Sequence, residues 1–118
     1  MITEINKSWS WKGFNATDII RTNDFGNVIF KTDKNEYWRI CPEEVTCIKI
    51  AENQSGFEKL LNDSEFIEDW EMVNIIKSAK SVVGVLKSGE KYCLKMPALI
   101  GGLYEKSNYG KVPHKELI

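Results

Sequence analysis

The sequence predicts an α+β domain, with an antiparallel sheet of about five strands and helices packed mainly on one side of it. Three observations lead to this prediction. Short apolar runs separated by polar turns fill the first half of the chain, a helical period follows, and short runs return at the end. Strands and helices in separate blocks are typical of the α+β class. No linker, repeat or low-complexity tract interrupts the 118 residues, so we expect one domain over residues 1–118.

The first half of the chain is expected to begin with helix and to continue with three strands. Residues 7–22 mix aromatic and aliphatic residues with polar ones and predict one or two short helices. Residues 27–32 and 36–40 flank the polar stretch DKN, which predicts a hairpin. Residues 45–51 alternate in hydrophobicity and predict a third strand that is buried mainly on one face.

From residue 55 onward the apolar period becomes helical. Apolar residues at positions 57–61 predict a short helix that ends near Asn62, and Asp63 or Ser64 can cap the helix that follows. Residues 72–83 carry an apolar stripe at three- and four-residue steps. Phe66 and Trp70 do not lie on this stripe, so we expect the helix to break, or to be buried from a second side, near Trp70.

The end of the chain is expected to return to extended structure. Residues 85–96 surround Ser88 and Gly89 and predict a second hairpin. Paired glycines at positions 101–102 predict a loop, and residues 111–118 predict a last strand that Pro113 restricts to an edge.

The composition is that of a globular domain without a strong charge bias. The charged fraction is 28% and the hydrophobic fraction 42%, and the formal net charge of −1 argues against a dedicated nucleic-acid binder. No apolar run has the length of a signal peptide or a membrane span. Cys41, Cys47 and Cys93 are an odd number, which argues against a complete disulfide framework. We therefore expect reduced thiols and a cytoplasmic protein.

The triplet Asp24-Phe25-Gly26 has the same letters as the magnesium-binding motif of protein kinases. A kinase also needs a glycine-rich loop, a strand lysine and a His-Arg-Asp catalytic loop, and the sequence has none of these. Asn, Asp and Gly are typical turn residues. The triplet therefore predicts a turn that Phe25 fixes to the core.

The other candidate sites also have simpler structural interpretations. Gly101-Gly102 is not followed by the lysine of a phosphate loop and predicts a bulge or a close backbone crossing. Cys41 and Cys47 are too far apart for a zinc knuckle. The single histidine, His114, lies in a segment with no obvious scaffold. We therefore predict a protein that is not an enzyme, with no catalytic residues, no cofactor and no metal site.

The strongest electrostatic feature is an acidic window at residues 52–71. Seven acidic residues and one lysine give this window a formal charge of −6. One interpretation is structural, because acids in the first turns of helices complement the helix dipole. The other is a patch that attracts a basic partner. The candidate partner-binding residues are Glu58, Asp63, Glu65, Glu68 and Glu71.

Several fragments together are similar to one protein family. They include NDFGNVIF, EYWRICPEE, FIEDWEM and SGEKYCLKMPALIGGLYEKSN. In this order and spacing, from about Trp9 to Ile118, the chain resembles the C-terminal domain of type VI secretion immunity proteins. Most of the positions that carry the resemblance are of types that build a core or an unusual backbone: Phe25, Gly26, Trp38, Pro42, Trp70, Gly101, Gly102 and Tyr104.

The resemblance implies a bacterial cytoplasmic protein that binds and neutralises a cognate toxin, which is a DNase effector in characterised relatives. We expect a monomer or a weak dimer that contacts neither nucleic acid nor membrane. One alternative is a small-ligand-binding or regulatory domain, with Gly101, Gly102 and Tyr104 lining a pocket. A hydrolase is a third and weaker alternative.

Overall fold

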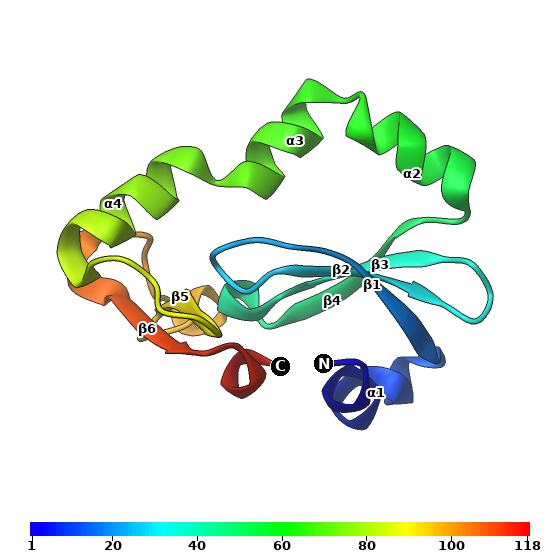
Figure 1. Cartoon of the computed structure of the whole chain (residues 1–118), viewed down its shortest axis with the longest axis horizontal. Helices are drawn as coiled ribbons and strands as arrows, with labels where there is room; N and C mark the ends of the chain where they lie inside the picture. The colour runs from blue at the N-terminus through cyan, green and yellow to red at the C-terminus, as the bar shows by residue number, and fades with distance from the viewer.

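The first half of the chain forms a four-stranded antiparallel sheet (Figure 1). The computed structural model describes all residues, 1–118. The strands follow the chain order across the sheet: β1 (Ala16–Thr22), β2 (Val28–Thr32), β3 (Tyr37–Cys41) and β4 (Thr46–Ala51). The hairpin of β2 and β3 and the strand β4 are those that the sequence predicts, and the α+β class is confirmed.

Helices cover both faces of this sheet (Figure 1). α1 (Ile2–Trp9) lies on one face, whereas α2 (Gln54–Leu61), α3 (Ser64–Glu71) and α4 (Val73–Val83) form an arch on the other side. Successive side chains of β2 point to opposite faces of the sheet. Val28 and Phe30 pack with Ile5 of α1, and Ile29 between them packs with Trp70 of α3. All of these β2 side chains are fully buried.

A second, two-stranded antiparallel sheet consists of β5 (Glu90–Leu94) and β6 (Tyr109–Pro113). The strands of the domain are therefore divided between two sheets rather than joined in one. α4 packs against β6, and the core between them contains Ala79, Tyr92 and Tyr109. Phe25, from the turn between β1 and β2, is fully buried in this same core and so connects the two sheets.

Two predicted elements differ from the structure. Residues 16–22 form the edge strand β1 instead of helix. The strand exposes most of its side chains and buries only Ala16, so its sequence has no alternating pattern that would indicate a strand. Residues 85–87 form no strand: β5 pairs with β6, which lies after the loop of residues 95–108. The predicted second hairpin is therefore wrong, although a turn does form there, with the Glu90 amide donating to the Lys87 carbonyl.

The helical arch bends at Met72, as the position of Trp70 predicts. Met72 lies between α3 and α4 with φ of 49°. A non-glycine residue in the left-handed region is held there by its surroundings. The buried side chain of Asn23 contributes to this, because its Nδ2 donates to the Trp70 carbonyl oxygen (2.9 Å) and contacts the Met72 sulfur (3.5 Å).

The Asp24-Phe25-Gly26 triplet lies in a turn, with the Gly26 amide donating to the Asn23 carbonyl at 3.1 Å. The Asn23 Oδ1 accepts from the amides of Phe25 and Asn27, and Gly26 supplies the positive φ of 73°. These local hydrogen bonds and the conformation of Gly26 therefore explain the triplet as a structural turn.

His114 packs against this turn and should make the stability dependent on pH. Its Nε2 lies 3.0 Å from the Gly26 carbonyl oxygen, and burial lowers the pKa of the imidazole despite this hydrogen bond. The unfolded chain therefore binds a proton more readily than the folded one below about pH 6.5, so stability should fall as the pH drops through this range.

We expect the melting temperature to fall between about pH 7.5 and pH 5.5, before most carboxylates titrate. The His114→Gln variant, whose amide can still donate to the Gly26 carbonyl, should show a flatter profile over the same range. Thermal unfolding followed by circular dichroism measures both. Equal slopes in the two proteins would assign the dependence to other groups.

Candidate functional site

A cleft of about 400 Å³ lies between the sheet and the bend of the helical arch. Arg39, Cys41 and Ile48 line it from strands β3 and β4. Residues of α3, the bend and α4 also line it, and so does Tyr104. Four of its lining residues are acidic: Glu43, Glu44, Glu68 and Asp69.

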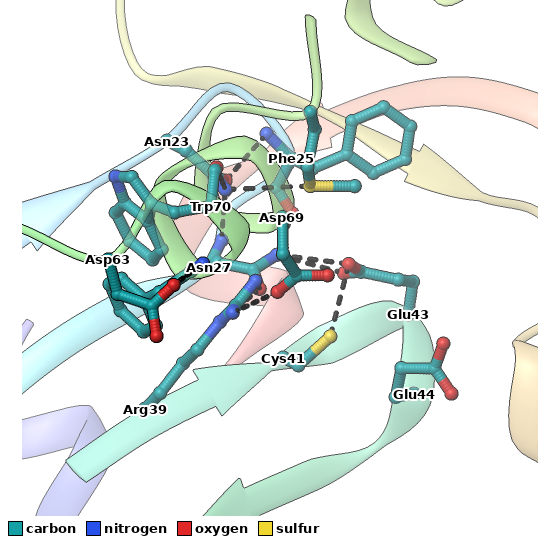
Figure 2. A network of polar contacts seen from close by, with 12 residues as sticks. Asn23, Phe25, Asn27, Arg39, Cys41, Glu43, Glu44, Asp63, Asp69 and Trp70 are labelled. Carbon is teal, nitrogen blue, oxygen red and sulfur yellow. Dashed lines mark hydrogen bonds and ion pairs between the residues drawn. The ribbon is translucent and has the colours of Figure 1, made fainter. Parts of the chain in front are cut away.

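A polar network centred on Asn27 lies beside this cleft (Figure 2). The Asn27 side chain is fully buried between a cation and an anion. Its Oδ1 accepts from Arg39 Nε and Nη2 at 3.0 and 2.9 Å, and its Nδ2 donates to both oxygens of Glu43 at 3.1 Å. One amide therefore satisfies parts of two charged groups that lie four positions apart in the sequence, beyond the turn that carries Asn27 itself.

Arg39 connects the sheet to the helical arch. Its Nη1 forms an ion pair with Asp69 of α3 at 2.6 Å, and its guanidinium lies over the ring of Trp70 at 5.2 Å. A guanidinium can stack on an aromatic ring and bond a carboxylate at its edge at the same time. These contacts fix the orientation of α3 relative to the cleft.

The only thiol in the cleft is held in its protonated form. Cys41 Sγ donates to Glu43 Oε1 at 3.1 Å. Burial, followed by the negative charge of Glu43 and this hydrogen bond, raises the pKa of the Cys41 thiol. Nucleophilic cysteines have lowered pKa values in electropositive surroundings. The chemistry of the cleft therefore suits binding rather than cysteine catalysis.

The second half of the chain matches a known family model. The model, described as T6SS immunity protein Tdi1, C-terminal, matches residues 51–118. This chain belongs to that family. No match to a curated protein was found. The family range begins at the last residue of β4 and includes the helical arch and the second sheet, while the fragments NDFGNVIF and EYWRICPEE precede it.

The acidic residues that the sequence singles out in this immunity domain are all exposed on α2 and α3 or between them. Glu65, Glu68 and Glu71 are exposed on α3, whose buried residue is Trp70. Asp63 is the N-cap of α3, and its carboxylate accepts from the amides of Glu65 and Phe66. Glu58 is on α2, where it accepts from Gln54.

Only part of this acidic set reaches the cleft. Glu68 lines it, and Glu71 joins Glu68 at a shallow neighbouring hollow along α3 and the start of α4. Glu43 and Glu44, on a short 3₁₀ turn (Pro42–Glu44), add acids that the sequence reasoning did not select. Both lie outside the acidic window. The one feature of the sequence that could have indicated them is the fragment PEE, which directly follows the strand that carries Arg39.

The remaining residues of the predicted motif lie mostly in packing positions. Trp38 packs on Phe14 with ring centroids 4.9 Å apart, and Pro42 begins the 3₁₀ turn that carries Glu43. Tyr104 lines the cleft, whereas Gly101 and Gly102 are not among the residues that line it. None of the helices has the length and apolar character that a helix spanning a bilayer requires.

Proposed function

We propose that this member of the T6SS immunity family is a non-enzymatic inhibitor that binds a nuclease effector in the bacterial cytoplasm and neutralises it. Family membership supports an immunity role, and the identity of the toxin as a DNase is our inference. We expect the protein to occlude the active site of the toxin or to hold the toxin inactive, and to act as a monomer or a weak dimer. The three free cysteines are in keeping with a reducing compartment.

The observation that carries this proposal is the exposed acidic surface of α3. Glu65, Glu68 and Glu71 are exposed together on one short helix, next to a cleft with further acids. A nuclease must present a basic surface to the phosphates of DNA. An acidic surface can occupy such a groove and also accelerates the encounter with it. DNA is excluded from the toxin when this surface is bound.

Charge reversal on α3 tests the proposal. Glu65, Glu68 and Glu71 are replaced together by lysine, and affinity for the toxin that co-purifies with the tagged protein is measured by calorimetry at several salt concentrations. We expect a loss of about tenfold or more at low salt and a weaker salt dependence, because opposite charges no longer face each other. The DNase activity of the toxin, measured with and without each protein, should be inhibited less by the variant.

The matched control replaces Asp18, Asp33 and Glu116 by lysine, which changes the net charge equally at exposed positions outside α3. This control should bind with near wild-type affinity. If both triple variants lose affinity alike, general electrostatics is responsible and α3 is not the contact. If the α3 variant binds unchanged, the acidic surface has no part in recognition.

A further inference from the structure

The loop between β5 and β6 exposes an unusual number of large apolar side chains. The exposed fractions are 51% for Met96, 66% for Leu99, 68% for Ile100 and 62% for Leu103. Surfaces of monomeric proteins rarely gather apolar side chains in this way unless they bind a partner. The family match includes this loop but assigns it no role.

The loop is held in one shape although its side chains face solvent. Asn108 Oδ1 accepts from the Met96 amide at 2.8 Å, and its Nδ2 donates to the carbonyls of Met96 and Leu103 at 2.9 and 3.0 Å. A Cβ on Gly102 would lie 1.7 Å from the Met96 carbonyl oxygen, so only glycine fits there. Because the loop is already ordered, a partner that binds it has little conformational entropy to remove.

The apolar loop and the acidic cleft adjoin each other. The 3₁₀ turn of the loop (Ala98–Ile100) packs against the 3₁₀ turn (Pro42–Glu44) that carries Glu43 and Glu44. Tyr104, in the same loop, donates its hydroxyl to Glu44 Oε1 at 2.9 Å and lines the cleft. The two features therefore form one continuous surface.

The charges in the cleft favour a cationic partner. Arg39 directs its donors to Asn27 and Asp69. Glu43, Glu44 and Glu68 have no ion pair with a cation of this chain. The walls beside them include the apolar side chains of Ile48, Met72 and Ile75. An apolar wall with an unpaired carboxylate suits a lysine or arginine, whose stem is apolar and whose head is charged.

We propose that residues 96–104 and the acidic cleft form one docking surface for a basic protein partner, with apolar contacts on the loop and a lysine or arginine side chain in the cleft near Glu44 and Glu68. This inference rests on the proposed function, and its partner is the same toxin. A second copy of the chain suits the surface less well, because a two-fold interface near the cleft would bring two acidic surfaces together.

The test compares two pairs of substitutions with two matched pairs. Leu99→Ser with Leu103→Ser alters the loop, and Glu44→Gln with Glu68→Gln neutralises the cleft. Val82→Ser with Val85→Ser, and Asp33→Asn with Glu116→Gln, are the controls at other exposed positions. Affinity for the co-purified toxin is measured by calorimetry at low and high salt, and the melting temperature of each variant shows that it is folded.

We expect both the loop pair and the cleft pair to weaken binding by about tenfold or more, since few residues carry most of the affinity of an interface. The loss from the cleft pair should shrink at high salt, whereas the loss from the loop pair should not. Both control pairs should bind as the wild type does. If the loop pair is unstable, the single substitution Leu99→Lys is used in its place. The added lysine should repel a basic partner.

The outcomes separate this inference from the proposed function. Wild-type affinity in both the loop and the cleft pairs, with the α3 reversal still harmful, would overturn the docking surface and leave the immunity proposal intact. Failure of the wild-type protein to retain any toxin would overturn both. A wild-type dimer in light scattering that the loop pair converts to monomer would assign the loop to a second copy and overturn the inference.

Discussion

Replacing Trp70 with alanine should lower the free energy of unfolding by about 3–5 kcal/mol, which is a large part of the stability of a small domain. The ring is buried between the sheet and the arch, in a cluster with Ile29, Tyr37 and Phe57. Its removal leaves a cavity that rigid neighbours on the sheet cannot fill. It also removes the aromatic face over which the Arg39 guanidinium lies.

Urea denaturation followed by far-ultraviolet circular dichroism measures this loss without depending on tryptophan fluorescence. Trp11→Ala is the matched control, because Trp11 is 74% exposed and its loss should change stability by less than about 0.5 kcal/mol. Trp70→Phe should fall between the two, since it retains part of the ring. A Trp70→Ala protein as stable as Trp11→Ala would show that the arch does not depend on this contact.

The sequence predicted the elements whose pattern is local. The polar DKN stretch between two apolar runs gave the hairpin of β2 and β3, and Asp63 marked the start of α3. Trp70 lies off the apolar stripe of α4 because it belongs to a separate helix that faces the sheet, which is why its position predicted the bend at Met72.

The elements that were not predicted lack a periodic pattern or a nearby pairing partner. β1 is an edge strand that buries only Ala16, so no periodic pattern separates it from a loop or a helix. β5 has its pairing partner beyond the loop of residues 95–108, and the nearer turn at Gly89 suggested a local hairpin instead. In both segments, pairing with another strand decides the structure, and the propensity of the segment's own residues does not.

The sequence likewise predicted one part of the candidate site and missed another. The sequence alone revealed the acidic window, because its seven acids lie within 20 consecutive residues, 52–71. The polar network beside the cleft consists of Asn27, Arg39, Glu43 and Asp69, which come from a turn, a strand, a 3₁₀ turn and a helix. No spacing rule connects these four positions, so only the fold could bring them together.

The second large effect should come from Asn27→Ala, which we expect to cost at least about 3 kcal/mol of stability. The substitution removes both hydrogen bonds that the Asn27 amide donates to Glu43, a residue that is only 5% exposed, and leaves the carboxylate with only the Cys41 thiol. It also deprives Arg39 of the oxygen that accepts from its Nε and Nη2. A buried charge without partners is far more costly than a lost contact between neutral groups.

A second substitution separates the charge from the cavity. If the uncompensated carboxylate causes the loss, Glu43→Gln in the Asn27→Ala background should recover part of the stability, although Glu43→Gln alone destabilises the wild type. A cavity would give two additive losses in the double variant instead. Asn74→Ala, at an exposed position of α4, controls for removal of an amide and should leave stability nearly unchanged or slightly higher. Urea denaturation of the four variants decides between these results, and a recovery would show that Asn27 holds the acidic cleft in place by solvating Glu43.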